Sequence, residues 1–167
     1  PIRINYWKER LKSLGNGPYI GVSWKSANMD MIRLPNYATI SELYPVLKLP
    51  NVTYVNLQYT DFANDLTEIK KELGVTIHNF DDLDHFNNID DVAALCAALD
   101  MVVSTKTTVP LISAGVGKLT KLANWRQSPW NNILLNPVGP SIDIFERDTW
   151  EPWDNVFSSI AEDIFTT

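Results

Sequence analysis

The sequence predicts a single α/β domain with a Rossmann-like, mainly parallel sheet and helices on both of its faces. Its 167 residues are a normal length for one domain. Short apolar runs alternate with segments of helical periodicity along most of the chain, and this alternation favours parallel strands joined by crossover helices. No internal repeat, low-complexity tract or linker divides the chain, so we expect residues 1–167 to form one unit.

Five apolar runs are expected to form strands. They lie at residues 19–24, 52–58, 75–79, 101–104 and 118–122, and a short run at 133–135 is a candidate sixth strand. Because parallel sheets are covered on both faces, their inner strands are apolar almost throughout. We therefore expect Val22, Val55, Ile77 and Val102 to lie on central strands.

Helical periodicity and capping signals indicate six helices. The expected ranges are 1–17, 39–49, 61–73, 89–99, 107–114 and 153–165. Thr39 and Glu42 have the spacing of a capping box, and either Asp61 or Asn64 is expected to cap the third helix. Gly74 stands where a helix commonly ends in the left-handed conformation.

Composition and charge exclude several classes of partner. The net charge of −6 disfavours nucleic-acid binding, which depends on clustered lysine and arginine. The chain has no apolar run of about eighteen residues and no signal peptide, so we expect no membrane span and a cytoplasmic location. Since the chain opens with Pro1, we expect it to be a piece of a longer protein. Its single cysteine, Cys96, lies in an apolar run and is expected to be a small buried hydrophobe rather than a nucleophile.

The strongest candidate binding feature is the stretch from Ser104 to Pro110, between a strand end and a helix start. Ligands of open α/β sheets bind outside the carboxyl ends of the strands. The N–H groups of Thr107 and Thr108, which begin the helix, are expected to point freely into a cleft. Hydroxyl groups and the Lys106 ammonium would add donors for phosphate oxygens. The alternative is an ordinary capped helix start.

Three further candidate regions follow other strands. Ser23 and Lys25 leave the first strand at the same edge, and Gln58 at the end of the second strand has an amide that could recognise a nucleobase. In the loop after the fifth strand, Trp125 and Trp130 could stack on a ring or a sugar. Alternatively, the first loop is only solvated and the two tryptophans only cover the edge of the core.

Several common catalytic signatures are absent. The chain has no GxGxxG, GxxxxGK[ST] or GxSxG motif. His85 with Asp81, Asp82 and Asp84 could form a metal cluster, but the spacing does not match a standard zinc site and a solvated loop is the better interpretation. We therefore expect no metal and no cofactor, and the catalytic residues remain unassigned.

The order of the short motifs resembles a known family. The motifs are Gly21-Val22-Ser23-Trp24-Lys25, Leu57-Gln58, Ala93 to Ser104, Thr107 to Gly117 and Trp125 to Trp130, with Trp150 near the end. They resemble the C-terminal domain of the heptosyltransferase-like GT-B glycosyltransferases that follow tetratricopeptide repeats in bacterial proteins. More distantly, they are similar to O-linked N-acetylglucosamine transferases. The resemblance covers nearly the whole chain.

The resemblance implies a half-domain that binds a nucleotide diphosphate-sugar. Thr107 and Thr108 would hold the diphosphate, Ser23 and Lys25 would reach it from the first loop, and Gln58 would lie near the nucleoside. In this family the acceptor site and the usual catalytic base belong to an N-terminal half that is missing here. Residues 1–17 would be the helix that connects the two halves, and the parent chain would also carry tetratricopeptide repeats. The chain alone is therefore expected to be inactive.

Two positions depart from the family's phosphate turn. Lys106 stands where the family has an aspartate, and Leu111 stands where it has a histidine. Both replaced residues belong to the family's donor site, although Lys106 could still pair with a diphosphate. The main alternative function is therefore a non-catalytic binding or scaffold domain that has kept the fold and lost the donor site. A flavodoxin-like signalling domain is disfavoured, because Ser23 and Gln58 occupy strand ends where it needs a phosphorylatable aspartate.

Overall fold

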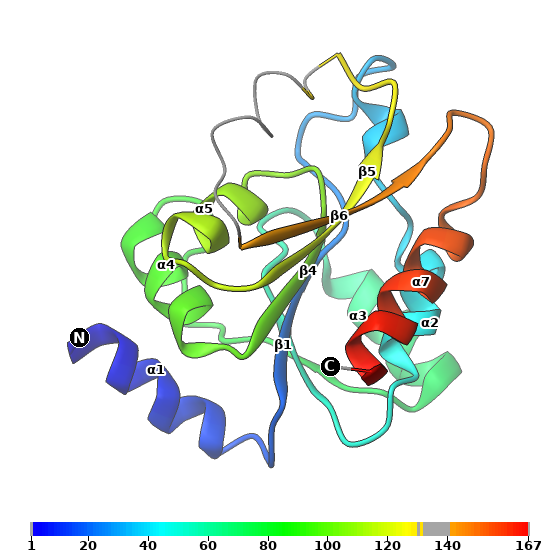
Figure 1. Ribbon diagram of the computed structural model, residues 1–167. Helices are drawn as coiled ribbons and strands as arrows, with labels where there is room; N and C mark the ends of the chain where they lie inside the picture. Colours follow the sequence, from blue (N-terminus) through cyan, green and yellow to red (C-terminus); the bar gives the residue numbers. More distant parts are fainter. Residues whose placement is uncertain (1, 130, 132–140, 167) are drawn as a thin grey trace.

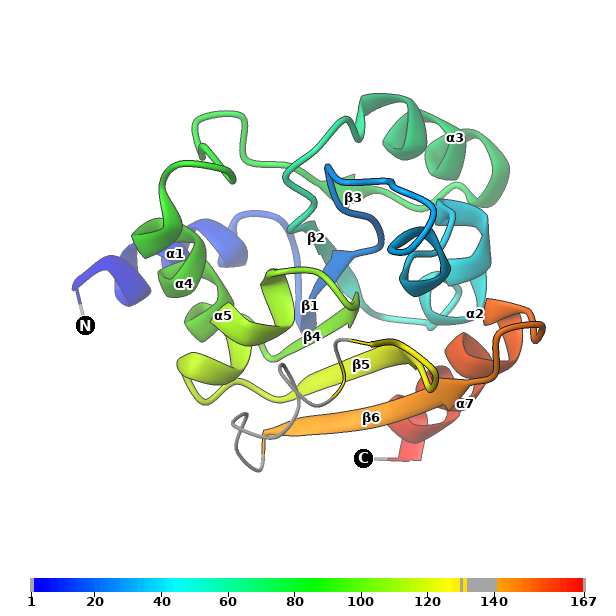
Figure 2. The same ribbon diagram turned by 90° about the horizontal axis from the view of Figure 1, so that it is seen from above.

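The computed structural model describes residues 2–129, 131 and 141–166, which form one sheet between two layers of helices (Figure 1). All five neighbouring strand pairs are parallel. The strand order is β3-β2-β1-β4-β5-β6 (Figure 2). The strands are β1 (Tyr19–Ser23), β2 (Thr53–Asn56), β3 (Ile77–His78), β4 (Met101–Thr105), β5 (Thr120–Trp125) and β6 (Ile142–Arg147). The expected Rossmann-like parallel sheet is confirmed.

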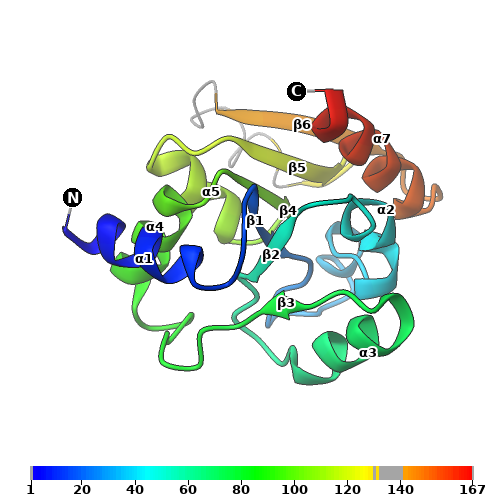
Figure 3. The same cartoon turned by 90° about the horizontal axis from the view of Figure 1, so that it is seen from below.

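Helices cover both faces of the sheet (Figure 3). One face carries α1 (Ile2–Lys12), α4 (Ile89–Ala98) and α5 (Val109–Gly115). The other face carries η2 (Ile40–Leu43), α2 (Tyr44–Leu47), α3 (Ala63–Leu73) and α7 (Trp153–Thr166), and a short 3₁₀ turn, η1 (Leu34–Asn36), lies in the loop after β1. No helix in the described ranges is long and apolar enough to cross a membrane.

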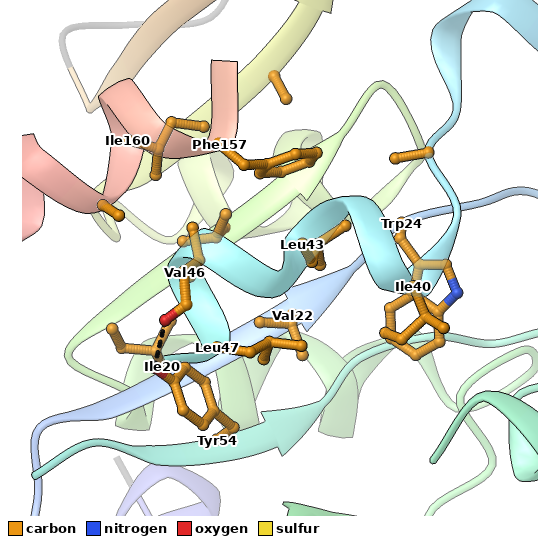
Figure 4. Close-up of a cluster of buried hydrophobic side chains, with 14 of the residues drawn as sticks. Ile20, Val22, Trp24, Ile40, Leu43, Val46, Leu47, Tyr54, Phe157 and Ile160 are labelled. Atoms are coloured by element: carbon orange, nitrogen blue, oxygen red, sulfur yellow. Dashed lines mark hydrogen bonds between the residues drawn. The ribbon is translucent and has the colours of Figure 1, made fainter. Parts of the chain in front are cut away.

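The larger core lies beneath α2 and α7 (Figure 4). Trp24, Tyr54 and Phe157 are its largest fully buried side chains. The Tyr54 hydroxyl donates a hydrogen bond to the carbonyl oxygen of Val46, so its polar end is satisfied inside the core. This packing fixes the carboxyl ends of β1 and β2, where the candidate site begins.

The second core lies under α1 and α4, and it requires glycine at position 21. Trp7 and Leu11 of α1 are buried there with residues of α4. A Cβ atom at Gly21 would stand 2.4 Å from Leu57 Cδ1 and 2.6 Å from Leu99 Cδ1. Both distances are shorter than van der Waals contact, so the absence of a side chain lets the two leucines pack directly on β1.

Some expected strand positions are wrong. Ile77 lies on β3, which is an edge strand rather than a central one, whereas Val22, Val55 and Val102 lie on inner strands. The fifth strand begins at Thr120 and continues to Trp125, so it is shifted toward the carboxyl end. The sixth strand is β6, which the sequence did not predict, and the candidate strand at 133–135 lies outside the described residues.

The capping signals are partly confirmed. The Glu42 carboxylate accepts a 2.7 Å hydrogen bond from the Thr39 N–H, as a capping box requires. Gly74 ends α3 with a φ of 68°, in the left-handed region. The cap of α3 is Phe62 rather than Asp61 or Asn64. The first helix ends at Lys12 and α5 begins at Val109, so both are shorter than expected.

Candidate functional site

The candidate site lies where the strand order reverses. β1 pairs with β2 on one side and with β4 on the other, so the loops that leave β1 and β4 diverge toward opposite faces of the sheet. In open α/β sheets this arrangement creates the ligand crevice at the carboxyl edge. The two loops with the strongest sequence signals, after Ser23 and after Thr105, are the two that meet at this point.

Three hydroxyl groups meet between β1 and β4. The Thr107 Oγ1 lies 3.4 Å from the Ser23 Oγ and 3.3 Å from the Ser104 Oγ. Beside them, the Thr105 hydroxyl donates a 2.8 Å hydrogen bond to the carbonyl oxygen of Trp24. Ser23, Ser104 and Thr107 are all buried. The structure therefore brings Ser23 and Thr107 together as expected, and it adds Ser104, the first residue of the same candidate stretch.

The backbone at the start of α5 is less open than expected. The Thr107 N–H donates a 2.8 Å hydrogen bond to the carbonyl oxygen of Thr105, so the expectation that it points freely into a cleft is wrong. The Val109 N–H donates to the Thr107 Oγ1 at 3.2 Å. Thr108 is exposed. A ligand at this turn would therefore meet Thr108 first, with the buried Thr107 supporting it.

Gln58 connects the loops that follow β1 and β2. Its Oε1 accepts hydrogen bonds from the Ser23 hydroxyl and from the backbone N–H groups of Trp24 and Lys25. Its Nε2 donates to the Lys25 carbonyl oxygen and to the Thr60 hydroxyl, both at 2.7 Å. The side chain is fully buried. Both ends of the amide are thus occupied by the protein, and Gln58 positions the first loop.

The two candidate lysines point to opposite sides of the β1–β4 crevice. The Lys25 Nζ pairs at 2.7 Å with the Asp65 carboxylate of α3, which also accepts a hydrogen bond from the Trp24 indole. The Lys106 Nζ instead lies beside the side-chain oxygens of Asn124 and Asn131, on the β5 side. The expectation that both lysines lie next to the Thr107 and Thr108 turn is therefore not met in this conformation.

Lys106 is the most unusual charge in the site. Only 7% of the residue is exposed, and its described partners are neutral amide oxygens. Burial lowers the pKa of Lys106 from 10.5 to about 8, and the nearby Glu146 only partly opposes this shift. Displaced pKa values of this kind are common at functional sites, where burial and specific neighbours act on a single group.

The aromatic loop after β5 packs against the protein. Trp125 is half-buried against the core beneath α7, and its indole N–H donates a 2.8 Å hydrogen bond to the Thr149 hydroxyl. Arg126 pairs with Glu146 and Asp148. Trp130 lies outside the described residues. In this conformation Trp125 covers the core edge, and its role in stacking on a ligand stays a prediction.

A cavity of about 100 Å³ opens beside Thr108. Its walls come from the end of β2, the loop before α4, and the starts of α4 and α5: Leu57, Tyr59, His85, Phe86, Ile89, Val92, Thr108, Val109 and Ile112. The sequence had treated the loop that contains His85 as solvated. Neither His85 nor its acidic neighbours form a metal-binding group, and no such group of three or more ligands occurs in the described part of the chain.

Comparisons with known proteins identify relatives of two kinds. The chain is 33% identical over 165 residues to Protein FlbA of Caulobacter vibrioides, and the match covers 96% of the chain but 27% of that protein. It therefore spans little more than a quarter of the length of this curated relative. No protein-family model matches the chain.

Solved structures of glycosyltransferases share the fold. The chain matches E. coli ADP-heptose lps heptosyltransferase II with a TM-score of 0.67 at 14% identity, over 98% of the chain and 50% of that protein. A glycosyl transferase family 9 protein from Veillonella parvula matches with a TM-score of 0.67 at 12% identity, over 99% and 50%. An E. coli heptosyltransferase with ADP-2-deoxy-2-fluoro heptose matches with a TM-score of 0.64 at 12% identity, over 98% of the chain and 47% of that protein. The fold of this chain is that of one half of a GT-B glycosyltransferase.

Proposed function

We propose that this chain is the nucleotide-sugar-binding half of a glycosyltransferase-like protein. The observation that carries the proposal is the meeting of Ser23, Ser104 and Thr107 at the β1–β4 crevice, with the buried Lys106 directly before Thr107 in the chain. Hydroxyl groups and a lysine ammonium are the donors that a diphosphate requires. One of the structural relatives is a heptosyltransferase with a nucleotide-sugar analogue.

In this proposal Thr108 and Lys106 contact the diphosphate directly. Thr108 is exposed at the turn, and the Lys106 ammonium can exchange neutral amide partners for phosphate oxygens. A charge-assisted hydrogen bond is stronger than a bond to a neutral amide. Ser23, Thr107 and Gln58 then shape the turn from below, while Lys25 must leave Asp65 before it can reach a ligand. Trp125 remains a candidate for stacking on the sugar.

We also propose that this chain is part of a longer protein. The chain spans about half of the solved glycosyltransferases and 27% of its curated relative. We therefore infer that an N-terminal GT-B half supplies the acceptor site and the catalytic base, and that tetratricopeptide repeats precede it in a cytoplasmic protein. The donor-binding half alone would bind its ligand without turning it over.

A scaffold domain is the second candidate, and specific contacts favour it. Both ends of the Gln58 amide are occupied, and Lys25 is neutralised by Asp65. Leu111 also places an apolar side chain where the family has a polar one. A domain that had lost its ligand would retain such internal contacts, because they stabilise the loops.

Calorimetry on the 167-residue chain separates the two candidates. We expect inorganic diphosphate and at least one of ADP, GDP and UDP to bind at millimolar concentration or below, and to bind more weakly as salt rises. Lys106→Ala should weaken diphosphate binding about tenfold or more, because a charge-assisted contact is lost. Lys8→Ala, at an exposed lysine of α1, is the matched control and should change nothing. The absence of heat with all four ligands would favour the scaffold.

A further inference from the structure

Three side chains form a row across the carboxyl ends of β4, β5 and β6, which lie side by side in the sheet (Figure 2). Asn124 on β5 pairs directly with Glu146 on β6. Lys106 directly follows β4, whose last residue pairs with the residue before Asn124. The Asn124 Nδ2 donates a 3.0 Å hydrogen bond to the Glu146 Oε1, and the Asn124 Oδ1 lies 3.5 Å from the Lys106 Nζ. A single amide therefore lies between a carboxylate and an ammonium.

The two charges fix the orientation of the Asn124 amide. If the amide were turned over, its NH₂ group would face the Lys106 ammonium and its oxygen would face the Glu146 carboxylate, and both contacts would be repulsive. Asn124 is fully buried, so water does not offer the amide other partners. The amide oxygen is therefore presented to Lys106.

A second amide holds the same ammonium. The Asn131 Oδ1 accepts a hydrogen bond from the Lys106 Nζ, and its Nδ2 donates to the carbonyl oxygens of Trp125 and Arg126 at 3.2 and 2.7 Å. An ammonium has three N–H donors, and the described part of the chain supplies these two amide acceptors. A phosphate oxygen can therefore bond to the third donor or replace the longer contact, to Asn124.

The two lysines of the candidate site differ in how their charge is balanced. The Lys25 Nζ pairs directly with the Asp65 carboxylate at 2.7 Å, so a ligand must break an ion pair to reach it. Burial lowers the pKa of Lys106 to about 8, and Glu146, one amide away, partly opposes this shift. Because charge attraction weakens with distance, the separated carboxylate helps to keep the Lys106 ammonium charged without pairing with it.

Glu146 also has a cationic partner of its own. Its Oε2 accepts a 3.3 Å hydrogen bond from the Arg126 Nε, and Arg126 also pairs with Asp148 at 3.2 Å. The Glu146 and Arg126 side chains are 36% and 55% exposed, whereas Lys106 is buried. Arg126 therefore pairs with Glu146 at the exposed end of the row, and Lys106 remains the unpaired charge at its buried end.

We propose that Asn124 is a positioning residue of the diphosphate site: it separates Lys106 from Glu146 and so keeps the ammonium available to the ligand. The inference rests on the proposed function, because it takes Lys106 to contact the diphosphate. In this arrangement Glu146 acts on the site through Asn124 and does not touch the ligand.

Replacing the separating amide by a carboxylate is the test. Asn124→Asp is nearly isosteric, and it should pair directly with Lys106 as Asp65 does with Lys25. We expect the affinity of the 167-residue chain for inorganic diphosphate, measured by calorimetry, to fall about tenfold, close to the effect of Lys106→Ala. In a Lys106→Ala background Asn124→Asp should weaken binding much less, because no ammonium is left to neutralise. Asn28→Asp, which adds the same charge in the exposed loop after β1, is the matched control and should change the affinity less than about twofold.

The titration of Lys106 gives a measurement that needs no ligand. Its side-chain NMR signals, identified by their absence in Lys106→Ala, should report a pKa of about 8 in the wild type. Asn124→Asp should raise this titration midpoint by about one pH unit or more, because a carboxylate in direct contact favours the charged form, and Glu146→Gln should lower it. Glu146 is partly exposed, so Glu146→Gln remains informative if Asn124→Asp folds poorly.

The outcomes separate this inference from the proposed function. An unchanged diphosphate affinity in Asn124→Asp, or a Lys106 midpoint that does not move in the stated directions, would overturn the inference. If the wild-type chain binds no diphosphate, the proposed function fails instead. The Lys106 midpoints of the ligand-free variants then still decide whether Asn124 separates the two charges.

Discussion

Replacing Lys106 by methionine should stabilise the folded chain while weakening its binding of diphosphate. The lysine is 7% exposed and its pKa is lowered from 10.5 to about 8. At about 1.4 kcal/mol per pKa unit, the charged ammonium costs the folded state about 3 kcal/mol at pH 7. Methionine retains most of the apolar stem but loses the bond to the asparagine oxygens, worth about 1 kcal/mol. The expected net gain in the free energy of unfolding is about 2 kcal/mol.

The pH dependence has a definite sign. Burial lowers the pKa of Lys106 in the folded state to about 8, so below pH 8 the lysine is charged in both the folded and the unfolded chain. The full free-energy penalty for burying the charge is present there. As the pH rises from about 8 toward 10.5 the folded chain loses this proton first, so the penalty shrinks. The advantage of Lys106→Met over the wild type should therefore fall from about 2 kcal/mol at pH 7 to about 1 kcal/mol at pH 9.

Urea unfolding at pH 7 and pH 9 measures these differences in the free energy of unfolding. The proteins compared are the wild type, Lys106→Met and the control Lys8→Met at an exposed position. The control should remain within about 0.5 kcal/mol of the wild type. Calorimetry measures the affinity of the same three proteins for inorganic diphosphate. A variant that is more stable but binds less well would indicate that the charge is retained for function. A destabilised Lys106→Met, or a stability gain that is the same at pH 7 and pH 9, would refute the reasoning.

Three other substitutions test the packing that supports the site. Gly21→Ala should lower the free energy of unfolding by about 1–3 kcal/mol in urea unfolding, because its Cβ would clash with Leu57 and Leu99; an unchanged midpoint would contradict this. Gln58→Leu should cost about 2–4 kcal/mol and increase amide hydrogen exchange in the loop after β1, since it leaves buried N–H groups unpaired. Lys121→Met should cost about 1–2 kcal/mol in thermal or urea unfolding, less than a fully buried pair, because the Asp143 and Asp163 partners are 48% and 40% exposed.

The inner strands could be predicted because they are buried on both faces. β1, β2 and β4 are almost entirely buried, so each contains a short apolar run that is visible in the sequence. β6 is an edge strand whose residues are mostly exposed or half-buried, so polar and apolar residues are mixed along it and no such run exists. β3 has two residues, which is too short for any periodicity. The edges of the sheet were therefore the part that sequence patterns predicted poorly.

The sequence predicted where the site residues lie but not which groups they bond to. Ser23, Thr107 and Gln58 could be placed at one edge because parallel strands share a carboxyl edge. Whether a polar group is free depends on residues distant in sequence. The Gln58 amide is satisfied by a loop more than thirty residues earlier, and Lys25 by an aspartate forty residues later. His85 was interpreted as solvated because only the folded loop shows that its two ring nitrogens are buried.

The two candidate functions differ in how they explain buried polar groups that lack a charged or hydrogen-bonding partner. A scaffold gains nothing from a buried ammonium among neutral amides, nor from a histidine with two unpaired nitrogens, because both oppose folding. Gln58 and Asp65 stabilise loops in a binding domain and in a scaffold alike, so their contacts do not distinguish the two functions. Lys106 lies two positions before Thr108 in the chain, at the turn where a diphosphate would bind in the proposed function. If Lys106 opposes folding and supports diphosphate binding, ligand binding explains its presence and a scaffold does not.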